Sequence, residues 1–140
     1  MRHPQNVVII ATVFIACVSG IFAAQNSISA DSDIDKLLTA ANKRDRAWEW
    51  RGPVPEVELV ARHGKSAASK LIKLLEHPNA ISFDDHIVVD QQIQLVLCRL
   101  FDEKPEHGRT IYLVRALEKE NAKVREFWIN RVNQYLREGR

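Results

Sequence analysis

Apolar residues recur at helical spacing along most of the chain behind its N-terminal region. A first short helix is expected over Ile34 to Ala41, with Ser32 or Asp33 placed to cap its first turn. A second helix is expected to open at Pro55, because proline suits the first helical position, and to end at Gly64, which favours a left-handed cap. Short helices joined by turns are therefore predicted for this half of the domain.

The clearest helical patterns follow in the next two segments. A third helix is predicted from Ser66 to about Glu76, where His77 and Pro78 end it. A fourth is expected to be capped by Asp84 or Asp85. Its broad apolar stripe consists of Val89, Ile93, Val96, Leu97, Leu100 and Phe101. This stripe predicts the central helix of the core.

The segment Thr110 to Val114 is β-branched and apolar, so its composition would also suit a strand. A helix is expected instead, because Ile111, Val114 and Leu117 keep helical spacing and no other segment offers a partner strand. A last helix is predicted from about Asn121 to Arg137. The fold class is thus all-α, with about five or six short helices packed as antiparallel hairpins.

The N-terminus carries a different pattern, in which Arg2 precedes an apolar run from Val7 to Val18. A membrane span needs about 20 apolar residues, so this run is typical of a signal peptide. We expect a signal peptide over residues 1–23, a flexible leader over 24–32 and a helical domain over 33–140. The protein is therefore predicted to be exported, to a secreted, periplasmic or envelope-associated location.

Two ways of cleaving the signal compete, and an uncleaved membrane anchor is the third alternative. Cleavage after Ile21-Phe22-Ala23 would release a chain that begins near Ala24. Alternatively, Phe14-Ile15-Ala16-Cys17 resembles the lipobox of bacterial lipoproteins, which implies lipidation of Cys17, although Phe14 stands where an aliphatic residue is usual. Contact with the membrane is expected only through the signal segment or such an anchor.

Charge and cysteine content narrow the function further. The 20 basic and 18 acidic side chains are interspersed and give a net charge of +2, so no nucleic-acid partner is expected. The lysines Lys65, Lys70 and Lys73 are attributed to a solvated helix face. After removal of the signal only Cys98 remains, which excludes an internal disulfide and predicts a buried, inert thiol.

An enzymatic alternative depends on one cluster of side chains that could bind a metal ion. The cluster consists of Asp84, Asp85, His86 and Asp90. His86 and Asp90 are four residues apart on a helix, and a third ligand would have to come from His63, His77 or His107. Acidic residues at a helix start are also expected for capping, so no catalytic residue and no cofactor is assigned.

The predicted helices pair in a way that resembles HEAT or armadillo-like repeats. The pair Ser66 to Glu76 and Val88 to Phe101 is echoed by Thr110 to Glu118 and Ala122 to Leu136. The segments Val89-Asp90-Gln91-Gln92-Ile93 and Val124-Arg125-Glu126-Phe127-Trp128 resemble the inner helices of such repeats, at an offset of about 35 residues against about 40 to 47 in HEAT repeats. The outer helix lacks the family's proline, so an irregular helix bundle is the alternative.

The resemblance implies an interaction or scaffold surface rather than an active site. Residues on the polar faces that such a surface could use are Gln91, Gln94, Arg125 and Asn133. We therefore expect an exported helical interaction module whose partner is another protein, and not an enzyme. The alternative is a small metal-dependent or accessory enzyme of the cell envelope that uses the Asp84, Asp85, His86 and Asp90 cluster.

Overall fold

The described residues of the computed structural model are 30–43, 52–76, 83–106 and 108–139, and for residues 83–85 only the backbone is described. These residues form helices joined by short connectors, with no strand among them, so the predicted all-α class is confirmed. Within these ranges, no helix has both the length and the apolarity that crossing a bilayer requires. The expected signal peptide over residues 1–23 and Cys17 lie outside the described residues.

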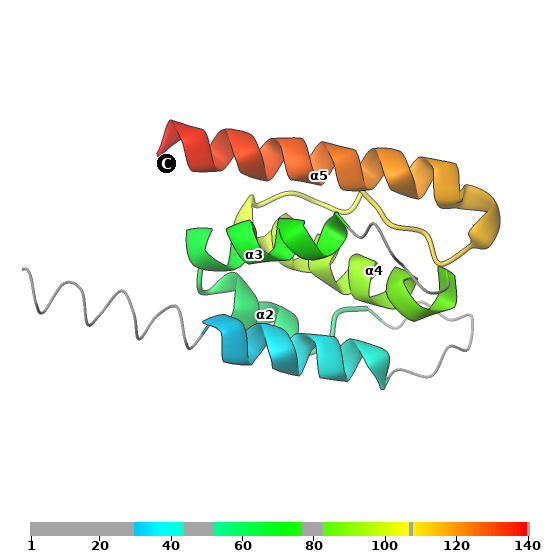
Figure 1. Cartoon of the computed structure of the whole chain (residues 1–140), viewed down its shortest axis with the longest axis horizontal. Helices are drawn as coiled ribbons and strands as arrows, with labels where there is room; N and C mark the ends of the chain where they lie inside the picture. The colour runs from blue at the N-terminus through cyan, green and yellow to red at the C-terminus, as the bar shows by residue number, and fades with distance from the viewer. Residues whose placement is uncertain (1–29, 44–51, 77–82, 107, 140) are drawn as a thin grey trace, which may run out of the picture.

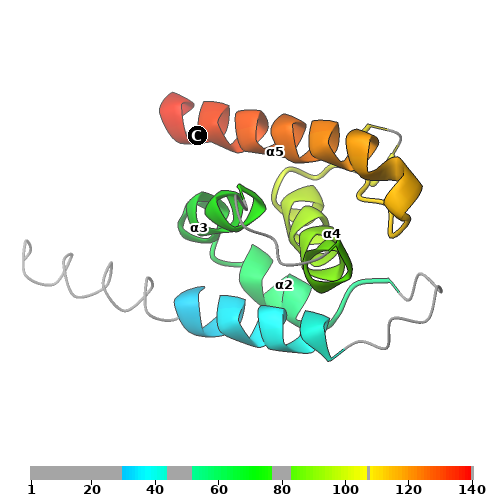
Figure 2. The same ribbon diagram turned by 45° about the vertical axis from the view of Figure 1, so that its right-hand side comes forward.

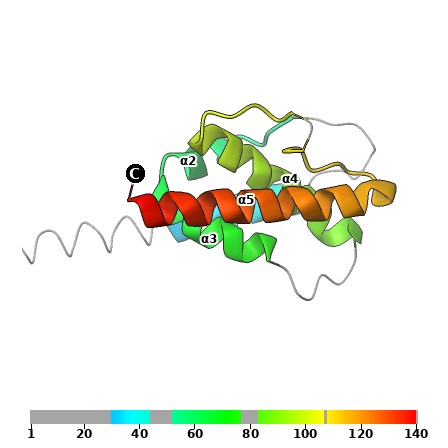
Figure 3. The same cartoon turned by 90° about the horizontal axis from the view of Figure 1, so that it is seen from above.

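The helices are arranged in three layers (Figure 1). A helix over residues 30–42 and the short helix α2 form one outer layer, α3 and α4 form the middle, and α5 covers the opposite side (Figures 1 and 2). Viewed from above, α5 runs lengthwise over the middle layer (Figure 3). The bounds are α2 Glu56–Ala61, α3 Lys65–Leu75, α4 Phe83–Leu100, the 3-10 turn η1 Arg115–Leu117 and α5 Glu118–Glu138.

α2 lies between Pro55 and Gly64, the two residues that were expected to bound the second helix. Pro55 has a helical backbone (φ −56°, ψ −29°) immediately before α2. Gly64 has φ +56°, a conformation that costs a residue with a Cβ more than it costs glycine, and it directly precedes α3. The predicted left-handed cap at Gly64 is wrong: α2 ends at Ala61, and Gly64, with φ +56° and ψ −127°, lies outside the left-handed helical region and precedes α3.

The apolar face predicted for the third helix lies in the core. Ala68, Leu71, Ile72 and Leu75 of α3 are buried, and α3 packs against both α4 and α5. α5 contributes Val124, Trp128 and Val132, which are spaced four residues apart and are fully or almost fully buried. Burial of these side chains from two layers contributes to the hydrophobic stabilisation of the domain.

Cys98 lies on α4 and is buried with a free thiol, as the sequence predicted. Burial raises the pKa of this thiol, because the charged thiolate would lose its hydration. Cys98 therefore contributes to the core as a small apolar side chain.

The start of the domain differs from the expectation. The chain is already helical at residue 30, so residues 30–32 belong to the helix and not to a flexible leader. Ser32 and Asp33 consequently lie inside this helix instead of capping it. Asp33 uses its carboxylate for two side-chain contacts, with Lys36 at 2.8 Å and with His63 at 2.9 Å. These partners explain why an acidic residue is accommodated after the first turn.

The helix expected over Thr110 to Val114 is a wrong prediction. This segment is not helical, and regular structure resumes only at the 3-10 turn η1 and at α5. The reason is that side chains of α4 and α5 bind the backbone here: Gln94 accepts a hydrogen bond from the Ile111 N–H at 2.9 Å, and Asn121 accepts one from the Tyr112 N–H at 2.8 Å. These bonds replace those that a helix would have made.

This correction also affects the repeat pattern. The helix α5 follows a largely extended connector, so the second of the two echoed pairs lacks the first helix that the resemblance expected over Thr110 to Glu118. The similarity to HEAT or armadillo-like repeats stays a prediction from the inner-helix segments.

Candidate functional site

The most polar part of the interior lies on α4, which carries four buried polar residues within one and a half turns. They are Asp90, Gln91, Gln92 and Gln94. The prediction that Gln91 and Gln94 face solvent is therefore wrong. α4 occupies the middle layer and contacts both α2 and α3, so the helix has no solvated face along this stretch.

Gln92 and Gln94 each hold a connector against α4. The Gln92 carboxamide accepts a hydrogen bond from the Val54 N–H at 2.9 Å, and its Nε2 donates to the Gly52 carbonyl at 3.5 Å. Gln94 accepts from the Ile111 N–H at 2.9 Å. An unpaired backbone N–H inside a protein costs free energy comparable to a lost hydrogen bond, so both glutamines make these non-helical segments compatible with burial.

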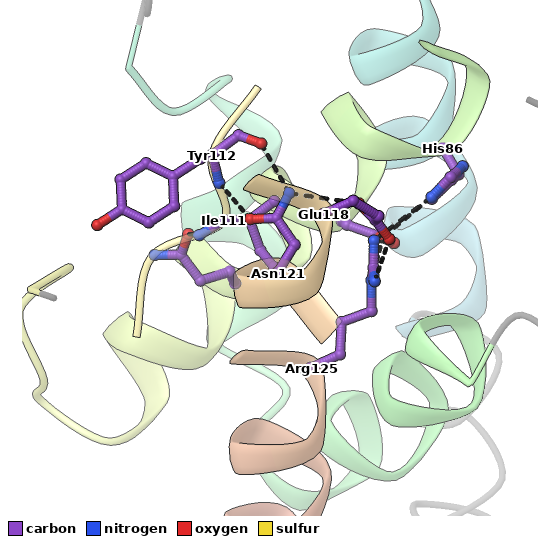
Figure 4. A network of polar contacts seen from close by, with 8 residues as sticks. His86, Ile111, Tyr112, Glu118, Asn121 and Arg125 are labelled. Carbon is purple, nitrogen blue, oxygen red and sulfur yellow. Dashed lines mark hydrogen bonds and ion pairs between the residues drawn. The ribbon is translucent and has the colours of Figure 1, made fainter. Parts of the chain in front are cut away.

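Asn121 does the same from α5, and it binds both polar groups of one residue (Figure 4). Its Oδ1 accepts from the Tyr112 N–H at 2.8 Å, and its Nδ2 donates to the Tyr112 carbonyl at 2.8 Å. A neighbouring β-strand would offer the same donor and acceptor. The side chain of Asn121 therefore substitutes for the partner strand that the sequence lacks.

A charged cluster joins α4 to α5 beside this network (Figure 4). Asp90, whose side chain is 0% exposed, accepts a hydrogen bond at Oδ2 from Arg125 Nε at 2.8 Å. Arg125 Nη1 binds Glu118 Oε1 at 2.7 Å, and Nη2 lies 3.4 Å from His86 Nε2. One guanidinium thus contacts two carboxylates and an imidazole.

The electrostatics of the cluster favour its ionised form. Burial by itself would raise the pKa of Glu118, but the hydrogen bond and charge of Arg125 outweigh it, so this pKa lies below its ordinary value. Burial would likewise lower the pKa of Arg125, yet the bonds from Glu118 and Asp90 leave it above its ordinary value. The cluster therefore links the two helices through ion pairs of Arg125 with Asp90 and Glu118.

The sequence had grouped His86 and Asp90 as possible metal ligands, and in the structure the guanidinium of Arg125 contacts both of them. His86 Nε2 lies 4.0 Å from Asp90 Oδ2, while Arg125 donates to that same oxygen. In the described ranges, no group of three or more histidine, cysteine, aspartate or glutamate side chains is close enough to hold a metal ion. The side chains of Asp84 and Asp85 are outside the described part.

The proposed third ligands do not complete that site within the described residues. His63 Nε2 lies 2.9 Å from Asp33 Oδ2, which ties the turn before α3 to the first helix. His77 and His107 lie outside the described residues. In the described part of the chain, Asp90 therefore forms an ion pair with Arg125 at 2.8 Å, and none of the proposed third metal ligands is shown beside it.

One shallow pocket of about 490 Å³ lies beside the first helix and the start of α2. Its lining residues are Ser32, Asp35, Lys36, Thr39, Ala40, Lys43 and Glu56. The lining combines ammonium and carboxylate groups on an open surface, so it specifies no particular class of ligand.

The sequence did not single out Glu118, Asn121 or Gln92 for any role, and it assigned Arg125 only to an exposed face. A signal was present: Asn121 and Arg125 alternate with Val124 and Trp128 along the apolar side of the last helix. A polar residue that interrupts an apolar stripe must find a partner when the stripe is buried. The partner itself lies far away in sequence, so only the fold identifies it.

Comparison with known proteins found no matching family model, no significantly similar curated protein and no significantly similar solved structure.

Proposed function

We propose that this protein is an exported helical interaction module whose partner is another protein. The observation that carries the proposal is the hydrogen bond from Arg125 Nε to Asp90 Oδ2 at 2.8 Å, which pairs these two charges inside the protein. These residues, with Gln92, Gln94 and Asn121, bind groups of the protein itself and fix the connectors between helices. A rigid helical frame of this kind presents surface to a partner at a small cost in conformational entropy.

Export is part of the same proposal and is supported by the apolar run from Val7 to Val18 behind Arg2. The similarity of the segments Val89 to Ile93 and Val124 to Trp128 to inner helices of HEAT or armadillo-like repeats agrees with an interaction role. The location would be secreted, periplasmic or envelope-associated, with Cys17 as the possible site of a lipid anchor.

The intact mass of the chain, expressed in bacteria with its own N-terminus, tests export. A product that begins near Ala24, or one that begins at Cys17 and carries lipid mass, is expected. A product that retains Met1 would contradict cleavage of the signal.

The interaction role is tested with this processed protein as bait for envelope and secreted fractions at native salt. We expect one captured protein that forms a stoichiometric complex when it is purified and mixed with the bait in analytical ultracentrifugation. Failure to form such a complex with any captured protein would contradict the proposal.

The metal-dependent enzyme is kept as the second candidate because His86 Nε2 and Asp90 Oδ2 are 4.0 Å apart. Titration with Zn²⁺ and Mn²⁺ distinguishes the two functions. Stoichiometric, tight binding that is lost in both His86→Ala and Asp90→Ala would favour the enzyme and displace the interaction module.

A further inference from the structure

A second charged cluster follows the C-terminal end of α4, where one carboxylate lies between two guanidinium groups. Glu103 Oε2 is 2.8 Å from Arg109 Nη1, and Glu103 Oε1 is 3.5 Å from Arg131 Nε. The Glu103 N–H donates to the Cys98 carbonyl at 2.8 Å, which fixes this residue at the end of α4. The carboxylate thus bridges the connector after α4 and helix α5.

Both guanidinium groups also lie over aromatic rings. Arg131 Cζ is 4.6 Å from the centroid of the Phe101 ring, and Arg109 Cζ is 5.5 Å from that of Phe127. The Arg109 carbonyl accepts a hydrogen bond from Trp128 Nε1 at 3.1 Å. Since ring contacts and the ion pairs with Glu103 already restrict both side chains, a ligand that binds them costs little additional rotamer entropy.

The two arginines have more hydrogen-bonding capacity than Glu103 uses. Each guanidinium has five N–H donors, and in the described part of the chain one nitrogen of each contacts the single carboxylate of Glu103. The side chains of Arg109 and Arg131 are 41% and 36% exposed, against 18% for Glu103. The donors left over can therefore be reached by an anion from solvent.

The surrounding charges select the kind of anion. The same connector carries exposed Asp102, Lys104 and Glu106, so the region does not create the strong positive field that nucleic acids or other polyanions require. A carboxylate already occupies the inner side of the two arginines. A second, singly charged carboxylate can accept hydrogen bonds from N–H groups that Glu103 does not contact, and arginine is enriched at the energetic centres of protein interfaces.

We propose that Arg109 and Arg131, held by Glu103 and by the rings of Phe127 and Phe101, form the docking point for a carboxylate group of a protein partner. This inference rests on the proposed function and specifies the chemistry of the partner: an aspartate, a glutamate or a C-terminal carboxylate. Arg109 and Arg131 together form the arginine pair.

The experiment is a titration of the processed full-length protein with the blocked peptide acetyl-(Glu)4-amide, followed by NMR of the arginine Nε–Hε signals. Saturable shifts at Arg109 and Arg131 are expected, with no saturable shift from the uncharged control acetyl-(Gln)4-amide. Tighter binding of inorganic phosphate than of the peptide would overturn the assignment to a carboxylate.

Variants then test the residues. Arg109→Gln and Arg131→Gln are each expected to weaken peptide binding by at least about tenfold, because each removes charge-assisted hydrogen bonds. Arg137→Gln, which removes one charge from an exposed site on the same helix, is expected to leave binding unchanged. Equal weakening by all three variants would mean attraction by overall charge and would refute the docking point.

A separate variant guards against loss of folding. Arg131→Lys keeps the charge and loses the planar fork, so we expect weaker binding with an unchanged thermal midpoint. Binding equal to that of the original protein would contradict the role of the fork.

Failure of this inference is distinguishable from failure of the proposed function. If the captured partner binds the Arg109→Gln, Arg131→Gln double variant as tightly as the original protein, the interaction module stands and the arginine pair is refuted. If the peptide binds the arginine pair but no protein forms a stoichiometric complex, the docking chemistry stands and the proposed function fails.

Discussion

α3 and α4 pack against each other in the middle layer, yet they bury different kinds of side chain. α3 buries one apolar face that includes Leu71 and leaves Lys73 exposed. α4 is buried without interruption from Val89 to Cys98, and this stretch includes an aspartate and three glutamines. A helix covered on one side needs only an apolar stripe, whereas a helix covered on all sides must supply partners for every polar group that it buries.

The largest effect is expected where α4 buries a charge. Asp90→Ala should lower the free energy of unfolding by about 3 to 5 kcal/mol, because Arg125 would stay in the interior without the carboxylate at its Nε. Urea denaturation followed by circular dichroism measures this. The double variant Asp90→Leu, Arg125→Met should recover most of the loss, since two apolar side chains need no pairing. A loss below about 1 kcal/mol in Asp90→Ala would contradict a buried ionic link.

The matching change in α3 removes apolar volume and no polar partner. Leu71→Ala should cost about 2 to 5 kcal/mol in the same denaturation experiment, because Leu71 is fully buried and its loss leaves a cavity. Leu59→Ala is the control, since Leu59 is among the exposed large apolar residues of the described part. Similar losses for both variants would refute the assignment of Leu71 to the core.

A smaller effect separates two adjacent glutamines of α4. Gln92→Met should cost about 1 to 3 kcal/mol, because the Val54 N–H would lose its acceptor inside the protein. Gln91→Met changes the same atoms at a buried neighbouring position and should cost less. Equal effects at the two positions would mean that the hydrogen bond to Val54 contributes no stability of its own.

The smallest expected effect is a change in the pH dependence of stability. It concerns Asp33 in the first helix, in the outer layer opposite α5. Hydrogen bonds from His63 and then Lys36 hold the pKa of Asp33 below its ordinary value of 3.8. Its stabilising contribution is therefore complete above about pH 3.8 and is lost as the pH falls through the lower folded-state value. Asp33→Asn should reduce the fall in the free energy of unfolding at acid pH, measured by urea denaturation at a series of pH values. Asp35→Asn, on the exposed side of the same helix, is the control, and an identical fall in both would contradict the assignment.

The comparison of α3 with α4 also explains how much of the fold the sequence could predict. α3 was placed to within one residue at each end, because its apolar period directly reflects the side on which it is covered. α4 was located as the central helix, but Gln91 and Gln94 were assigned to solvent, since periodicity describes one face and cannot show that the opposite face is also covered.

The connector over Thr110 to Val114 could not be predicted for a related reason. Its helical spacing is real, but the local preference was outweighed by bonds from Gln94 and Asn121, which lie 17 and 9 residues away in the chain from the groups they bind. The charged cluster is similar, because Asp90 and Arg125 are separated by 35 residues. Contacts of this kind depend on how the layers stack, and the sequence pattern of one helix does not encode them.

The pair of hydrogen bonds between the Asn121 side chain and the Tyr112 backbone has a consequence for hydrogen exchange. A non-helical connector normally exchanges its amide protons rapidly, but the Tyr112 amide is bound to a side chain of α5 and exchanges only when this hydrogen bond opens. The deuterium uptake of this one amide therefore reports how often the contact between the connector and α5 opens. In Asn121→Ala, the Tyr112 amide should exchange faster than in the original protein, while the α5 amides keep their protection.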